Sequence, residues 1–405
     1  MWSSALQPIE DAALTYFMSS YVPGSHFEYL PRLHSKTCLN SPLSTTVYAA
    51  SLAILSLHLG EPSLMNKARN TYAKGLAATN LALKSTTIAV EDSTLTSVLL
   101  LSLFEAIVYA GLNTPENWIT HTQGALALVK IRGIEQFETE TGRRLFRQVS
   151  NIIRVTCIQQ KARLPQDLVD LQSTAELFYE PNHPHLTFAT TIVDLTNFLA
   201  DLREGFLSPL EAVRSAMQQD QKYVRLLANM PDSWKYRGIF LRTHREDTYA
   251  NVIHQYPNHH VAQLWNSCRM VRILLSEISY AQAAQMGDPT TPLHSSKALL
   301  QEQAVRNIEQ AARDICASIP QFSGPSSTDT NTPDKSPIRA YAASVLWPLS
   351  AVRGASLASE TARSYCVERL RSLGRQLKVP QAERIATHDY ELEALKDGLH
   401  MFYVT

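Results

Sequence analysis

Residues 94–111, TLTSVLLLSLFEAIVYAG, are the segment that most limits what this chain can fold into. Apolar side chains lie on every side of a helix drawn through it, and Glu105 is its only charged residue. A helix that is apolar all round belongs in the centre of a bundle, and its most apolar stretch, residues 98–110, is too short to span a bilayer. We therefore expect a helical protein built around it. We expect Glu105 to pair with an arginine or a helix N-terminus rather than to act as a catalytic acid.

Composition fits a helical protein without net charge. The 405 residues include only 14 glycines, and low glycine with abundant alanine and leucine favours helices over a turn-rich β architecture. Lysine plus arginine (37) equals aspartate plus glutamate (37), so no global positive field would attract nucleic acid. The N-terminus lacks the basic and apolar regions of a secretory signal. These features predict a soluble intracellular protein that binds neither nucleic acid nor membrane directly.

No motif for metal or cofactor chemistry is present. The sequence contains no glycine-rich nucleotide loop, no nucleophile elbow and no HExxH metal helix. His183 and His185 are neighbours in a proline-rich loop, but no third ligand is suggested nearby. The cysteines are single and widely spaced, which fits a reducing compartment and excludes a Cys-x2-Cys zinc pair: Cys38, Cys157, Cys268, Cys316 and Cys366. We predict no metal site and no cofactor.

The stretch 114–133, TPENWITHTQGALALVKIRG, predicts a helix with a marked face. Thr114 and Pro115 are typical of a helix start, and Gly133 can adopt the left-handed conformation that closes a helix. Gly124 removes bulk mid-helix, which predicts the close approach of another helix there. Spacings of three and four residues place one set on a single face, which indicates a buried packing helix: Trp118, His121, Ala125, Leu128 and Arg132.

Together these residues read Trp-x2-His-x2-Gly-Ala-x2-Leu-x3-Arg-Gly. The pattern resembles the central signature of the fungal-specific transcription factor regulatory domain. That helical domain usually follows a zinc cluster of six cysteines, and its family is not known for enzymes. The matching positions are Trp118, His121, Gly124, Ala125, Leu128, Arg132 and Gly133. The resemblance implies regulation of transcription and brings no catalytic residues with it.

A second part of the resemblance lies after the midpoint, in Trp-Asn-x2-Arg-x2-Arg. Trp265, Asn266, Arg269 and Arg272 form this motif, and helical spacing places the indole and both guanidiniums on one face. We expect cation–π contacts or carboxylate partners to hold them in a structural network between helices, with an anion site as the alternative. Further along, Leu-Trp-Pro-Leu resembles the C-terminal pattern of the family, and Pro348 is expected to end or kink a helix near Trp347.

A locally basic helix is predicted over residues 141–161. A solvated outer face is its expected role, with a nucleic-acid surface as the weaker alternative. Its cations and those just beyond it are Arg143, Arg144, Arg147, Arg154, Lys161 and Arg163.

We therefore predict an all-α fold over residues 1–405, a single large domain of about a dozen helices with long loops. Residues 321–337, rich in Ser, Thr, Pro and Asp, are predicted to form a flexible surface loop. No strand alternation and no DNA-binding domain are recognised in the chain.

Three functions compete, of which the third is a passive dimerising scaffold. The first is a nuclear transcription regulator of a fungal metabolic or secondary-metabolite gene cluster, acting through a protein partner, a homodimer or a small apolar effector because the zinc cluster is absent. The second, with a cytoplasmic location as an alternative, is a helical scaffold that has become a cyclase or isomerase for an apolar metabolite. We favour the first.

Overall fold

The computed structural model describes residues 9–38, 40–109, 115–180, 183–243, 245–286, 293–323, 344–377 and 380–387. The structure is 77% helical, which confirms the all-α prediction. The remaining regular structure is one short antiparallel hairpin of β1 (Arg237–Phe240) and β2 (Val252–Gln255), with Arg237 opposite Gln255. The sequence did not predict this hairpin, because its two strands are four residues long and mostly polar or exposed.

The N-terminal helices pack around the segment that the sequence placed at the centre. Every residue of α6 from Thr94 to Phe104 is buried, with α3, α4 and α7 packed around it. The burial explains why this helix carries no charge between Asp92 in its first turn and Glu105. In chain order the helices of this part are α1 (Ile9–Ser20), α2 (Leu30–His34), α3 (Pro42–Leu59), α4 (Pro62–Ala82), α5 (Thr86–Ala89) and α6 (Asp92–Val108).

Among the described helices, α3 alone is long and apolar enough to cross a membrane by length and composition. In this fold 67% of it is buried inside the protein, as expected for a core helix.

The close helix approach predicted at Gly124 is wrong, and it occurs at Gly75 instead. A Cβ added at Gly124 would meet no atom within 4 Å. One added at Gly75 would lie 2.9 Å from the Thr46 side chain, where α4 crosses α3. Gly124 therefore has no steric reason to be glycine in the described structure.

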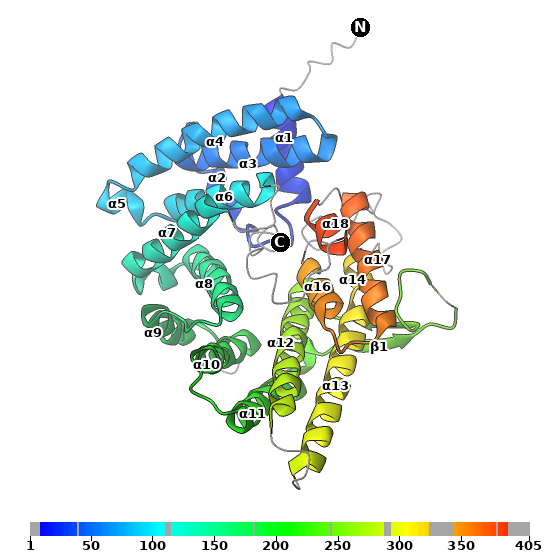
Figure 1. The fold of residues 1–405 in the computed structure, drawn as a ribbon. Coiled ribbons are helices and arrows are strands. Elements are labelled where there is room, and N and C mark those ends of the chain that lie inside the picture. The colour runs from blue at the N-terminus through cyan, green and yellow to red at the C-terminus, as the bar shows by residue number, and fades with distance from the viewer. Residues whose placement is uncertain are drawn as a thin grey trace.

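The next helices continue in an arch, drawn from cyan to green in Figure 1. They are α7 (Glu116–Arg132), α8 (Glu140–Gln160), α9 (Gln166–Ala175), α10 (Pro184–Glu204) and α11 (Pro209–Ala228), with single 3-10 turns at Glu135–Glu138, Glu176–Phe178 and Asp232–Trp234. Helix α7 begins one residue after Pro115, and Gly133 closes it with a positive φ of +57° but with a ψ of −145°, outside the left-handed helical conformation. Thr114 lies outside the described residues.

The C-terminal part packs on the other side of α12. Its helices are α12 (His259–Ala284), α13 (Leu293–Ser318), α14 (Pro320–Ser323), α16 (Leu346–Gly354), α17 (Glu360–Leu377) and α18 (Pro380–Thr387). Pro348 lies in the first turn of α16, where no backbone N–H is needed, so the prediction that it ends or kinks a helix is wrong. Of the predicted loop 321–337, residues 321–323 belong to α14, and the rest lies outside the described residues.

Two hydrophobic cores meet along α12. Leu264, Cys268 and Leu275 belong to the core of the N-terminal helices, whereas Val261 and Ile273 belong to the core of the C-terminal helices. The side chains of Trp234 and Trp265 pack against both cores. This one long helix therefore serves as a wall of each core.

Candidate functional site

A large cavity opens on the inside of the arch. Its volume is about 1360 Å³, above the roughly 300–1,000 Å³ typical of small-molecule sites. Helices α8, α9 and α10 form one side of it, α12 forms the opposite side, and α16 and the loop around His26 contribute the remaining walls. Figure 1 shows these helices arranged around the centre of the molecule. The cavity is therefore large enough for a ligand of several fused rings.

One face of α8 supplies most of the polar wall. Arg144, Arg147, Asn151 and Arg154 follow one another at spacings of three, four and three, so they share one side of the helix, and all four line the cavity. We call these four residues the α8 stripe. The prediction that this basic helix presents a solvated outer face is wrong for the three arginines of the α8 stripe, which line the cavity. Their charge is directed into the molecule.

Arg154 is a buried cation held only by neutral groups. Its side chain donates to Asn151 Oδ1 at 2.9 Å and to Gln172 Oε1 at 2.7 Å, and only 8% of the residue is exposed. Its Nε has no hydrogen-bond partner, and no described carboxylate forms an ion pair with it. Burial lowers the pKa of this guanidinium to about 10. A buried charge without a counterion is costly, and an anion in the cavity would relieve that cost.

Arg147 faces the cavity without an anionic partner. Within the described chain it makes no hydrogen bond and no ion pair, and its side chain is exposed. Its charge nevertheless acts on the histidines around it. Burial, followed by the charge of Arg147, lowers the pKa of His26 to about 4 and that of His185 to about 3. His26 is exposed where it lines the cavity. These imidazoles are therefore neutral at physiological pH.

Aromatic rings line the wall next to these charges. The rings of His183 and His185 stack with centroids 5.4 Å apart, and Trp234 meets both edge-on at 5.3 and 5.2 Å. His183 Nδ1 also accepts the backbone N–H of His185, which fixes the first turn of α10. Among the residues that the structure describes, no group of three or more His, Cys, Asp or Glu side chains could hold a metal ion.

The charge of the lining is positive. Arg144, Arg147, Arg154 and Lys161 outnumber the carboxylates Glu28 and Glu277. Arg144 is shared, because it pairs with Glu140 at 2.8 Å and lies 4.0 Å from Glu28. Much of the remaining wall is apolar or aromatic, including Ile152, Val155, Phe188, Ile192, Leu264, Val271 and Trp347. An apolar body with one negative group fits this distribution.

The first signature contributes to the core more than to the cavity. Trp118 is 3% exposed and lines the cavity at one edge, whereas His121 does not. His121 Nε2 lies 3.1 Å from the hydroxyl of Tyr72, and that hydroxyl donates to Glu105 Oε1 at 2.5 Å. Burial lowers the pKa of His121. His121 is therefore part of a polar cluster between α4, α6 and α7.

The predicted partner of Glu105 is wrong. No arginine binds it among the described residues: Glu105 accepts hydrogen bonds from Tyr72 and, at 3.1 Å, from the side-chain Nδ2 of Asn117, which lies in the first turn of α7. The spacing of residues within one helix does not show which side chain of a neighbouring helix lies beside Glu105, so the sequence could not identify Tyr72 from α4 as its partner.

Arg132 joins the end of α7 to the start of α6. It donates to the carbonyl oxygen of Val90 at 2.8 Å and to Asp92 Oδ1 at 2.5 Å, and the residue is 8% exposed. A cation at a helix C-terminus that pairs with an acid at a helix N-terminus favours both helix dipoles.

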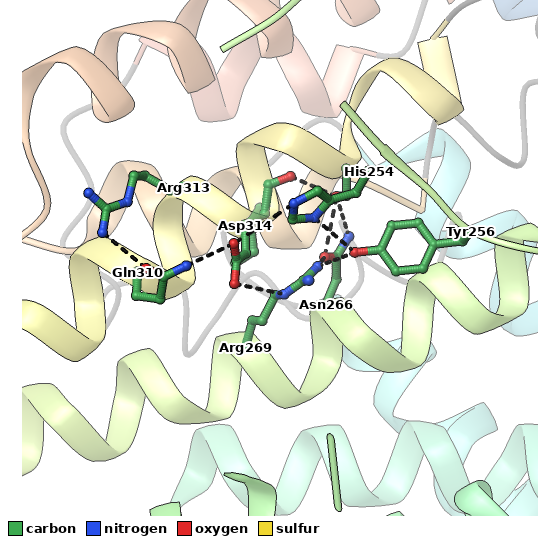
Figure 2. Close-up of polar contacts among 9 residues, drawn as sticks. His254, Tyr256, Asn266, Arg269, Gln310, Arg313 and Asp314 are labelled. Carbon is green, nitrogen blue, oxygen red and sulfur yellow. Dashed lines mark hydrogen bonds and ion pairs between the residues drawn. The ribbon is translucent and has the colours of Figure 1, made fainter. Parts of the chain in front are cut away.

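The second signature surrounds a buried arginine, shown in Figure 2. The Arg269 guanidinium donates to Tyr256 Oη at 2.5 Å and to Asn266 Oδ1 at 2.9 Å, and it lies 3.9 Å from Asp314. Its carbon is 5.3 Å from the ring centroid of Trp265. His254 lies 4.0 Å from Asp314, and burial followed by the charge of Arg269 lowers the pKa of His254 to about 4. The network links α12, α13 and the hairpin.

The other members of this signature also connect elements. Arg272 binds Asp220 through two contacts of 2.7 and 3.4 Å, which joins α12 to α11. Asn266 Nδ2 donates to Ser318 Oγ at 2.9 Å, which joins α12 to the end of α13. Both contacts are those of a structural network. Asn266 also contributes to the cavity lining, on the wall opposite the α8 stripe.

Sequence reasoning named Arg147 and Arg154 but did not place them in a cavity, and it did not single out His26 or Trp234. His26, Trp234 and Arg147 come from three segments that only the arch brings together. One signal was available for α8, since its arginines alternate with apolar Ile152, Val155 and Ile158. A helix face that carries both cations and apolar residues is not expected to be fully exposed to solvent.

Comparison with known protein families gives one match. Residues 14–157 match the model of the fungal specific transcription factor domain, a range that runs from α1 to near the end of α8. The resemblance read from the sequence is confirmed for this range. No curated protein and no solved structure matches the chain.

Proposed function

With residues 14–157 forming a fungal specific transcription factor domain, we propose that this chain regulates transcription in response to a small, largely apolar metabolite. The observation that carries the proposal is the cavity of about 1360 Å³ between α8, α10 and α12. A cavity of this size in a protein interior that is otherwise close-packed is a cost unless something fills it. The proposal includes location in the nucleus and action through a protein partner or a second copy of the chain.

The cavity is placed where a bound ligand would reach both parts of the fold. The family-matched helices supply Trp118 and the α8 stripe, whereas α12 supplies the opposite wall and belongs to both cores. A ligand that contacts both walls would favour the arrangement in which they are close together. Regulation then follows from differential binding to two arrangements.

The enzymatic alternative has less support. General acid–base groups work best with a pKa near the operating pH, but His26 and His185 have values of about 4 and 3. Their neutral rings are suited to stacking and hydrogen bonding. His121, the candidate acid–base group of the sequence, does not line the cavity.

The function is tested with a reporter gene in a fungal host. The complete chain is fused to a bacterial DNA-binding domain whose operator controls the reporter. Ser267 lies on the α12 wall and is only partly buried, so Ser267→Trp should fill the cavity, and Ser173→Trp on the exposed side of α9 is the matched control. We expect reporter output to respond to extracts rich in apolar metabolites, the Ser267→Trp fusion to lose that response, and the control to keep it. Equal responses of both variants would reject a role for the cavity.

A further inference from the structure

We propose that the cavity selects an aromatic ligand that carries a single acidic group, and that the α8 stripe binds this acid. The inference rests on the proposed function and adds the class of the ligand. A ligand of this class is an aromatic carboxylic acid or an acidic phenol.

The first argument is the set of donors that the α8 stripe leaves unused. Arg154 Nε is buried without a partner, and Arg147 makes no hydrogen bond among the described residues. Asn151 uses its Oδ1 to accept from Arg154, which leaves its Nδ2 as a donor. The three groups lie on one face over two helical turns, about 10 Å along the axis. A carboxylate in front of Asn151 would be within reach of both guanidiniums.

The second argument is the charge of Arg154. Two neutral amides hold it in place, so its position is fixed without neutralising it. Buried charges in proteins are usually paired, and charge-assisted hydrogen bonds to a carboxylate are about twice as strong as neutral ones. The missing counterion is thus best supplied by the ligand.

The third argument limits the ligand to one acidic group and gives it an aromatic body. Glu28 and Glu277 on the wall would repel further negative charges, which disfavours di- and triphosphates. The Trp234 ring and the neutral imidazoles of His183 and His185 provide ring edges and faces close to the cations. Flat aromatic rings bind such surfaces in edge-to-face or offset arrangements.

Two fluorescent probes with the same rings test the inference. Anilinonaphthalene sulfonate carries one anion, and N-phenylnaphthylamine is the same ring system without it. Both fluoresce in apolar sites, so affinities for the purified full chain come from direct titration. We expect the sulfonate to bind at least ~10-fold more tightly than the amine, and ~10-fold corresponds to one strong ionic contact. Raising the salt concentration should weaken the sulfonate alone.

Variants identify the groups responsible. Arg147→Gln changes an exposed residue and should leave the fold intact, and Arg154→Met keeps the volume of a buried side chain. Each should reduce sulfonate affinity about 5–10-fold and leave amine affinity within about twofold. Arg214→Gln, an exposed arginine outside the cavity, should change neither, and the melting temperature of each variant checks its folding.

The outcomes separate the two proposals. If both probes bind equally, are blocked by Ser267→Trp and ignore the arginine variants, the acid-selective site is overturned while the apolar effector cavity stands. If neither probe binds in a way that Ser267→Trp blocks, the effector cavity fails as well. Loss of sulfonate binding in Arg147→Gln alone, with normal amine binding and melting, supports the inference even if Arg154→Met does not fold.

Discussion

Trp265 Nε1 donates a 2.8 Å hydrogen bond to the backbone carbonyl oxygen of Trp234. The Trp234 ring in turn meets the stacked imidazoles of His183 and His185 at the cavity. The side chain of Trp265 also lies against the buried Arg269. The second signature motif thus fixes part of the cavity wall, although Trp265 itself does not line it.

Trp265→Phe should weaken ligand binding in the cavity without abolishing it. The change removes the hydrogen bond to Trp234 and keeps most of the packing, so we expect the free energy of unfolding to fall by ~1 kcal/mol. Affinity for both naphthalene probes should fall together, because the displaced Trp234 ring serves the aromatic body and not the acid. Urea denaturation beside probe titration measures both effects. An unchanged probe affinity would separate Trp265 from the cavity.

Arg269 should be irreplaceable by lysine. Its planar guanidinium donates to Tyr256 and Asn266 while lying beside Trp265, and lysine cannot make both contacts in that geometry. We expect Arg269→Lys to lower the free energy of unfolding by ~3 kcal/mol, the loss typical of a broken buried ionic contact. Arg306→Lys, on an exposed i,i+4 pair with Glu302, is the control and should cost less than ~0.5 kcal/mol. Equal losses in chemical denaturation would contradict the assignment.

Two changes in the first signature should separate core packing from ligand binding. Trp118→Ala should cost ~3–5 kcal/mol, as for other buried large aromatics. His121→Gln should cost less, ~1 kcal/mol, because one contact to Tyr72 is lost from a partly buried cluster. Since His121 does not line the cavity, probe affinity of His121→Gln should equal that of the wild type. A folded His121→Gln protein that no longer binds the probes would overturn this placement.

Acid should destabilise the fold through the cavity histidines. The folded pKa values of His26 and His185, about 4 and 3, lie below the ordinary value of 6.5. Between these limits the unfolded state binds more protons, so stability is complete above pH 6.5 and declines as the pH falls toward 4. The partly buried His185 imidazole adds a slope of up to ~1.4 kcal/mol per pH unit, and His26 adds less because its exposed ring is screened by solvent. The double variant His26→Asn, His185→Asn should show a flatter profile of unfolding free energy, and a profile parallel to that of the wild type would refute the prediction.

Alkylation should distinguish one cysteine from the other four. Cys38 is exposed, whereas Cys157, Cys268, Cys316 and Cys366 are buried. Burial raises the pKa of Cys157 to about 11 and that of Cys268 to about 12, which removes the reactive thiolate. Iodoacetamide should therefore label the native protein once, at Cys38, as read by peptide mass spectrometry, and label the denatured protein five times. Rapid native labelling of Cys268 would show that α12 opens.

The sequence predicted the fold class because its clearest signal is periodicity. The apolar segment in α6 and the Trp118–Arg132 face of α7 are patterns within single helices. Residue spacing alone predicted that both are buried, and both lie in the core. The helix crossing at Gly75 could not be found in this way, because a glycine reveals nothing about which helix faces it. The same holds for Tyr72 beside Glu105 and for the hairpin of four-residue strands.

The site was less predictable for a related reason. The arginines of α8 share a face by spacing, but only the arch determines whether that face meets water or the interior. A cation against neutral amides, as at Arg154, is a product of tertiary structure and leaves no mark in the sequence. The two signature motifs indicated residues that hold the helices together, whereas most residues proposed to bind the ligand lie outside these motifs.

The double role of α12 has a practical consequence for dissecting this protein into pieces. A fragment that stops where the family match stops, near residue 157, would lack the helix against which its own core closes. A fragment that starts after α12 would lack the same helix, which also packs against the core of the C-terminal helices. Deletion series would then report loss of function at almost every boundary, and each loss would reflect aggregation of an incomplete core. Point substitutions in the intact chain are the reliable way to map its activities.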